Sequence, residues 1–153
     1  MSPSEKSPLP LDAAEEALVR ALGHVMKKLP RAVDADMVRG GGLRLFDYGP
    51  LMFLSEAPDM QIRMSELAVA CNLTFSGMTR VVSRLEKQGF VQRVRCTEDQ
   101  RGLNAVLTEE GLARLRSSWG THLASVRRHV LDNLAGQDLA TLTSALRLIA
   151  KAC

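Results

Sequence analysis

The stretch MSELAVACNLTFSGMTRVVSRLEKQGFVQRVRCTEDQRGLNAVLTEEG, residues 64–111, decides the fold. It predicts a helix over 65–71, a turn at 72–74 and a second helix over 75–88, because Thr74 is a good N-cap and Gly89 suits the position after a helix. Residues 90–96 and 103–107 are rich in Val and Leu and predict two antiparallel strands joined by a charged loop. This order predicts a helix-turn-helix with a basic β-wing, a unit that holds duplex DNA by two grooves at once.

The second helix of this pattern has two chemically different sides. One side is apolar and is predicted to be buried in the core, and the opposite side carries small hydroxyl side chains and arginines. Arginine can bind guanine edges with two hydrogen bonds, hydroxyls can bond phosphates or bases, and Gly77 would let the helix N-terminus approach a phosphate closely. The alternative is an ordinary solvated face. The predicted DNA-binding residues of this helix are Thr74, Ser76, Gly77, Thr79, Arg80, Ser83 and Arg84.

The wing carries a second group of predicted DNA contacts. An arginine on a thin hairpin can enter the narrow minor groove, where the potential is most negative. Asp99 can hold the guanidinium of Arg101 through paired hydrogen bonds. The alternative is a plain salt bridge within the hairpin. The predicted wing residues are Arg93, Arg95, Asp99 and Arg101.

Helices are predicted on both sides of this unit. Upstream, apolar residues recur at steps of three and four from Leu11 to Leu29, and Pro30 is expected to kink or break that helix. The next helix is expected over 47–56, with Asp47 as its N-cap and Pro50 in its first turn. Downstream, Thr108 should cap a long helix whose apolar stripe reaches residue 134, and a last helix follows after Gly136.

Composition narrows the class of protein. The 153 residues make about one domain, and the segment 62–107 holds 7 basic and 4 acidic residues within a net charge of +3. Residues 1–10 contain three prolines and predict a disordered tail rather than a signal peptide. No run is long enough to cross a membrane. Cys71, Cys96 and Cys153 form no CxxC pair, which fits a reducing cytoplasm and a structural role.

No catalytic constellation is evident, so an enzyme, a cofactor and a metal site are not expected. The histidines His24, His122 and His129 have no plausible nucleophile near them in the sequence. The triplet Gly40-Gly41-Gly42 lacks the Lys-Ser/Thr of a phosphate-binding loop.

The order of these features resembles the MarR family of winged helix-turn-helix regulators. Gln100 stands where that family often has another arginine. The resemblance implies a homodimer built from the N-terminal and C-terminal helices, and a small-molecule cleft for which His24, Tyr48 and Met52 are candidates. These three are alternatively a surface histidine and two core residues. The matching segments are Ser65-Glu66-Leu67-Ala68, Thr79-Arg80, Arg84-Leu85-Glu86, Gly89, Asp99-x-Arg101 and Leu107-Thr108-x-x-Gly111.

The predicted fold is mainly α with a small β-wing. We expect a tail at 1–10, an N-terminal dimerisation helix region at 11–42, a winged helix-turn-helix DNA-binding domain at 43–108 and C-terminal dimerisation helices at 109–153. The predicted function is a dimeric cytoplasmic transcription regulator, a repressor, that binds a pseudo-palindromic double-stranded operator and responds to a small aromatic or anionic effector. The alternative is a winged-helix module for protein interaction, which would not require the arginines Arg80, Arg84 and Arg101.

Overall fold

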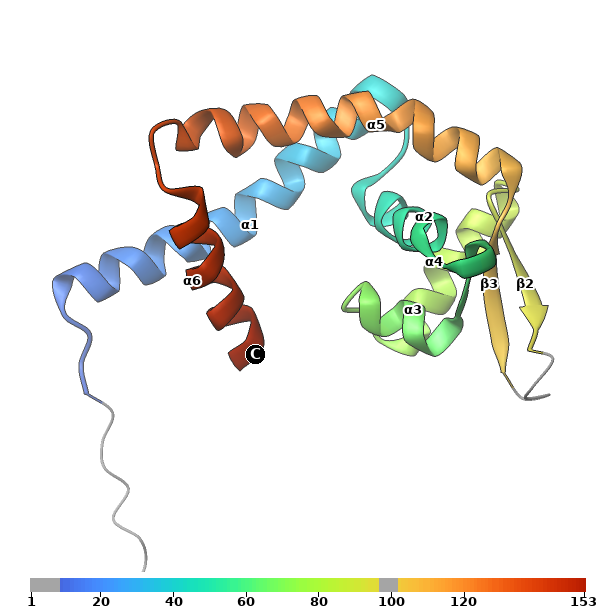
Figure 1. The fold of residues 1–153 in the computed structure, drawn as a ribbon, viewed down its shortest axis with the longest axis horizontal. Coiled ribbons are helices and arrows are strands. Elements are labelled where there is room, and N and C mark those ends of the chain that lie inside the picture. Colours follow the sequence, from blue (N-terminus) through green and yellow to red (C-terminus); the bar gives the residue numbers. More distant parts are fainter. Residues whose placement is uncertain (1–8, 97–101) are drawn as a thin grey trace, which may run out of the picture.

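The computed structural model describes residues 9–96 and 102–153 (Figure 1). It is mostly helical with one small sheet, as the sequence predicts. The elements in chain order are α1 (Ala13–Gly41), α2 (Leu45–Glu56), the 3-10 turn η1 (Pro58–Met60), β1 (Gln61–Arg63), α3 (Met64–Ala70), α4 (Phe75–Lys87), β2 (Val91–Arg95), β3 (Leu103–Leu107), α5 (Glu109–His129), the 3-10 turn η2 (Leu131–Leu134) and α6 (Leu139–Ala152).

The sheet is antiparallel with strand order β1-β3-β2. Ala105 at its centre is opposite Ile62 of β1 and Arg93 of β2, and it is fully buried. The hairpin of β2 and β3 is the predicted wing, and β1 is a short edge strand of the same sheet. The tip of the β2–β3 hairpin, which includes Asp99 and Arg101, lies outside the described residues.

One apolar core joins the helix-turn-helix to the long helices. It holds side chains from α2, α3, α4 and the sheet, together with Val33 and Met37 from the end of α1 and Leu115 from α5. Gly111 lies so close to the chain before β2 that an added Cβ would be 2.1 Å from the carbonyl oxygen of Phe90. The ends of α1 and α5 are therefore anchored on the compact unit that we call the reading head, residues 43–108.

The long N-terminal helix is not broken at Pro30, which was one of the two outcomes expected there. α1 continues through Pro30 to Gly41, although proline removes one backbone hydrogen bond from a helix interior. Packing explains the continuity, because the half after Pro30 lies along α5 and inserts Val33 and Met37 into the core. The helix ends at Gly42, whose φ of 70° is the left-handed conformation that glycine adopts readily.

Two helix boundaries also differ from expectation. α2 begins at Leu45 after Arg44, so Asp47 is not its N-cap and Pro50 is not in its first turn. The Asp47 carboxylate is instead bound by a side chain of α4. α5 ends at His129 rather than near Gly136, because Val130 leaves the helical conformation with φ of −123° and a 3-10 turn follows.

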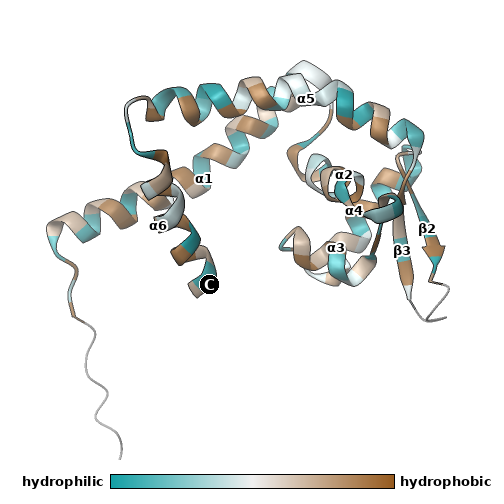
Figure 2. Ribbon diagram, in the orientation of Figure 1, coloured by the Kyte–Doolittle hydropathy of each residue, from teal (hydrophilic) through white to brown (hydrophobic). Residues whose placement is uncertain are grey.

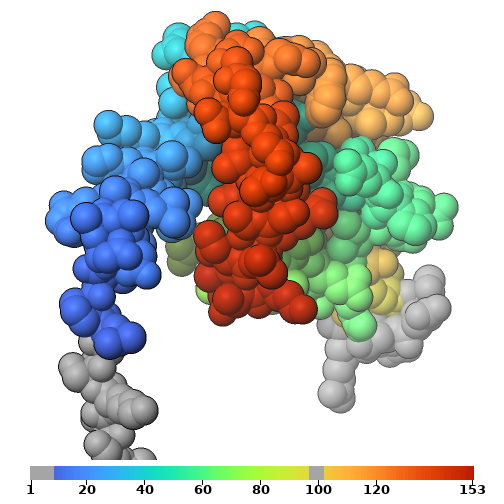
Figure 3. Space-filling view, turned by 60° about the vertical axis from the view of Figure 1, so that its left-hand side comes forward, coloured from blue at the N-terminus to red at the C-terminus, as the bar shows by residue number. Residues whose placement is uncertain are grey.

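The first half of α1 and the whole of α6 stand away from the reading head in Figure 1, and Figure 3 shows the blue start of α1 projecting from the rest of the molecule. None of the residues of α6 is buried. Apolar bands run along both segments and along α5 (Figure 2), and Trp119 on α5 is 54% exposed. None of the described helices is sufficiently long and apolar to span a membrane.

Candidate nucleic-acid interface

The helix-turn-helix is formed by α3, a short turn and α4. Asn72 in the turn has a φ of 52°, a left-handed conformation that asparagine tolerates better than most residues. The Thr74 hydroxyl accepts a hydrogen bond of 3.1 Å from the Gly77 amide and caps α4, as predicted. At the other end Gly89 adopts a φ of 77°. Local sequence therefore determines where α4 begins and ends.

The two sides of α4 are separated as the sequence indicates. Met78, Val81, Val82 and Leu85 are buried in the core, whereas Ser76, Arg80 and Lys87 are exposed on the opposite side. Arg80 forms no hydrogen bond or ion pair with any described residue. Its guanidinium is thus free to reach a base or a phosphate. This exposed strip is the recognition face of α4.

Two of the predicted DNA-binding residues of α4, Thr79 and Gly77, also make contacts within the helix or with its N-cap. Thr79 is half-buried and donates its hydroxyl proton to the Phe75 carbonyl oxygen at 2.9 Å. Gly77 is half-buried, and an added Cβ would lie 3.1 Å from the Thr74 hydroxyl oxygen. The close packing of the cap therefore explains the glycine at position 77 without any contact to a phosphate.

Arg84 connects α4 to α2 through Asp47. Its Nε atom donates to the two carboxylate oxygens of Asp47 at 3.1 and 3.3 Å, and a terminal guanidinium nitrogen makes a further bond. The Asp47 side chain is only 4% exposed, against 43% for Arg84. The hydrogen bonds that Arg84 donates to Asp47 raise the pKa of Arg84. This pair is a clamp on the recognition helix, while a contact of Arg84 with DNA stays a prediction.

Arg93 connects the wing to α4. Its guanidinium donates to Glu86 at 2.8 Å and to the Ser83 hydroxyl at 2.9 Å, and its backbone amide donates to Glu86 at 2.9 Å. The hydrogen bond from Arg93 lowers the pKa of Glu86. Arg93 is half-buried in this arrangement, so Ser83 and Arg93 serve first to join β2 to α4.

The described part of the wing leaves Arg95 exposed at the end of β2. Beyond it, the Cys96 amide donates to the Gly102 carbonyl oxygen at 2.9 Å, and the Cys96 thiol donates to Asn104 at 2.8 Å. These bonds continue the hairpin toward its tip. The minor-groove role predicted for Arg101 and Asp99 concerns residues outside the described part of the chain.

The candidate ligand residues are not brought together as a group. His24 is exposed on α1, Tyr48 is buried in the core, and Met52 is partly buried against it. The imidazole beside Tyr48 is that of His122 on α5, with ring centroids 4.4 Å apart, and Trp119 lies 6.2 Å from the same ring. Burial raises the pKa of Tyr48 and lowers that of His122. The Tyr48 hydroxyl has no hydrogen-bond partner among the described residues.

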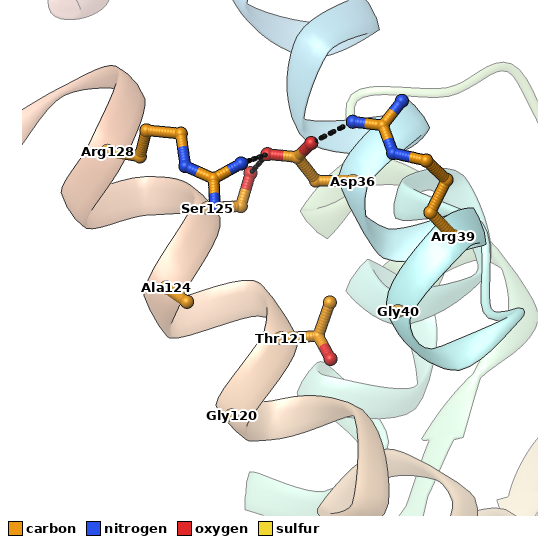
Figure 4. Close-up of a pocket in the computed structure, with 8 residues that line it drawn as sticks. All are labelled: Asp36, Arg39, Gly40, Gly120, Thr121, Ala124, Ser125 and Arg128. Atoms are coloured by element: carbon orange, nitrogen blue, oxygen red, sulfur yellow. Dashed lines mark hydrogen bonds and ion pairs between the residues drawn. The ribbon is translucent and has the colours of Figure 1, made fainter.

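Asp36 is a polar hub between α1 and α5 that the sequence did not reveal (Figure 4). Its Oδ2 atom accepts hydrogen bonds of 2.9 Å from Ser125 and from His129, and Arg39 binds its other oxygen. The bonds from Ser125 and His129 lower the pKa of Asp36. A cavity of about 450 Å³ opens beside it, lined also by Arg128. The partners lie 89 and 93 positions away, so no short-range pattern could have predicted them.

Cys71 lacks the surroundings of a reactive thiol. Burial raises the pKa of Cys71 to about 11, which disfavours the thiolate. Cys96 is engaged with Asn104, and Cys153 is exposed at the chain end. Among the described residues, no group of three or more His, Cys, Asp or Glu side chains could hold a metal ion.

Comparisons with known proteins agree with this arrangement. The MarR family model matches residues 50–103. The chain is 30% identical to the HTH-type transcriptional repressor YetL of Bacillus subtilis over 128 residues, which is 84% of this chain and 75% of that protein.

Two solved structures from Streptomyces coelicolor are similar over nearly the whole chain. Sco3205, a MarR family transcriptional regulator in complex with DNA, has a TM-score of 0.90 and 34% identity, and the match covers 97% of this chain and 92% of that one. AbsC, another MarR family regulator, has a TM-score of 0.87 and 38% identity over 95% and 97% of the two chains.

Proposed function

The chain belongs to the MarR family of transcriptional regulators, and from that premise we propose that it is a homodimeric cytoplasmic repressor of a pseudo-palindromic operator. The observation that carries the proposal is the recognition face of α4, on which Arg80 is exposed and unengaged by described residues. Arg93 and Arg95 of the wing lie on the next element, β2. The similar protein Sco3205 was solved in complex with DNA, which supports DNA as the partner of this chain.

The dimer is proposed from the uncovered apolar surface of the arms. Large apolar side chains that are at least 37% exposed follow one another along α6, and others lie on the first half of α1 and on α5. Monomeric proteins rarely expose large contiguous apolar patches, so an apolar surface of this kind indicates an interface with another chain. We therefore assign dimerisation to regions 11–42 and 109–153 and DNA reading to region 43–108. A twofold axis would place two α4 helices about one helical turn of DNA apart.

Control by a small ligand is the remaining part of the proposal. Tyr48 belongs to the reading head, whereas His122 and Trp119 belong to α5, so a ligand among these rings would contact both parts. Their planar faces and the unpartnered Tyr48 hydroxyl suit a small aromatic molecule with a polar or anionic group. Such a ligand releases DNA only if it binds the released arrangement more tightly than the DNA-bound one.

Selection of random duplexes by the purified protein tests the proposed function. We expect the selected fragments to share an inverted repeat, and binding to weaken steeply with salt because phosphate contacts release counterions. An Arg80→Ala protein should lose preference at one or two base positions of each half-site. Fragments without a shared inverted repeat at moderate salt would contradict operator binding by a dimer.

The ligand proposal needs a separate measurement. Aromatic carboxylates and phenols that raise the melting temperature are titrated against the operator complex, with the parent protein and with Tyr48→Phe and His24→Ala variants. We expect hits to release the operator, and Tyr48→Phe to shift the release titration while His24→Ala does not. Stabilisation without release would mean that the site is no switch.

A further inference from the structure

Phe75 is an exposed aromatic side chain at the first residue of the recognition helix. It is 59% exposed, whereas Phe53 and Phe90 pack against the core. An aromatic residue is not favoured in helices, so its presence does not help α4 to form. Phe75 therefore lies where it serves neither the core nor the helix.

The position of Phe75 points it toward the reading end of the helix-turn-helix. The N-terminal residues of a recognition helix are those that meet base edges in the major groove. At 3.6 residues per turn, Phe75 shares a flank of α4 with Thr79, and it lies closer round the helix axis to buried Met78 and Val82 than to Ser76 and Arg80. Its exposure comes from its place at the first turn, where the core no longer covers this flank. Phe75 thus stands exposed at the leading end of α4, bordering the recognition face rather than belonging to it.

Most of the polar residues of α4 and its cap that were predicted to bind DNA are engaged within the protein. The hydroxyl of Thr74 caps α4, that of Thr79 donates to a backbone carbonyl oxygen, and that of Ser83 accepts from Arg93. Arg84 is bound by Asp47. Base recognition by α4 is therefore left to exposed Ser76, Arg80 and Lys87 and to the apolar ring of Phe75.

Only one apolar group is offered by base pairs in the major groove, and that is the C5-methyl group of thymine. We propose that Phe75 packs against a thymine methyl in each half-site and makes α4 select thymine there. The inference rests on the proposed function, because it requires α4 to enter the major groove. A neighbouring guanine would be read by Arg80, whose guanidinium can bond its O6 and N7 atoms.

The test replaces each thymine of the selected operator, one at a time, by deoxyuridine, which lacks only the methyl group. For the parent protein we expect one position in each half-site at which the replacement raises Kd about three- to fivefold, the effect of one buried methyl group. In Phe75→Ala the thymine-to-uracil ratio of Kd values should fall to about one at that position. Where this variant binds weakly, the ratio is measured at lower salt, which strengthens all phosphate contacts equally.

Phe46→Ala is the matched control. Phe46 is 61% exposed but lies on α2, so its removal should leave the thymine-to-uracil ratio of the parent unchanged. A parent protein indifferent to every methyl group, or a Phe75→Ala protein that keeps the parent ratio, would overturn the inference while operator binding stands. A parent protein that selects no duplex would overturn the proposed function as well.

Discussion

The clamp between Arg84 and Asp47 allows a quantitative prediction. In Arg84→Ala the Asp47 carboxylate, with 4% of its side chain exposed, loses all the hydrogen bonds that the described residues give it. Removing one partner of a buried ion pair costs about 3–5 kcal/mol. Water can enter through the space of the half-exposed arginine, so we expect unfolding free energy to fall by about 2–4 kcal/mol.

The reciprocal substitution should cost less. In Asp47→Asn the guanidinium of Arg84 can turn into water, because 43% of its side chain is already exposed. The expected loss is about 1 kcal/mol, the net value of an ordinary hydrogen bond. The double variant should be more stable than Arg84→Ala alone, since it no longer buries an unpaired charge. The coupling free energy between the two sites should be about 1–2 kcal/mol.

Urea unfolding of the four proteins gives these values, provided that the protomer concentration is fixed, because the stability of a dimer depends on concentration. Operator affinity is measured in parallel. Arg80→Ala is the control, with unfolding free energy within about 0.5 kcal/mol of the parent and a loss of about 1–3 kcal/mol in operator binding. If Arg84→Ala behaves as this control does, Arg84 is a DNA contact rather than a clamp and the reasoning is refuted.

Three further outcomes follow from the structure. Gly111→Ala should lower unfolding free energy by about 1–3 kcal/mol, because its Cβ would collide with the Phe90 carbonyl oxygen; an unchanged melting temperature would contradict this. Deletion of 137–153 should leave a monomer or aggregate without tight operator binding, and a stable truncated dimer in sedimentation would argue against the proposed interface. Because the pKa of Asp36 is lowered in the folded protein, its carboxylate stabilises the fold above its usual value of 3.8, and that contribution is lost as pH falls through the lowered value. The stability gap between the parent and Asp36→Asn should therefore narrow on acidification, and a gap that is constant with pH would disprove this linkage.

The sequence by itself determined the elements whose signals are local. The N-cap residue Thr74, the left-handed turn at Asn72 and the positive φ of Gly89 were predicted because each depends on a few neighbouring residues. The apolar side of α4 was predicted because helical periodicity reports burial directly. The resemblance of residues 64–111 to a known family predicted the function. Each motif in this stretch is a weak signal alone, but their order and spacing together are specific to that family.

Tertiary structure decided which of the predicted side chains are free to act. Arg84 and Arg93 look equivalent to Arg80 in the sequence, yet they are bound by Asp47 and Glu86. Such pairs form wherever folding brings opposite charges together, and no local pattern predicts a pair whose members are 37 positions apart.

The continuity of α1 and the polar hub at Asp36 have the same origin. Pro30 is unfavourable in a helix by itself, but packing of the following turns on α5 and in the core outweighs the loss of one hydrogen bond. Asp36 on α1 meets Ser125 and His129 only because α5 returns along α1 after the reading head is complete. Helix propensities and caps contribute about a few tenths to a few kcal/mol each, and they can be predicted from neighbouring residues in the sequence. These long-range contacts form only once the whole chain has folded.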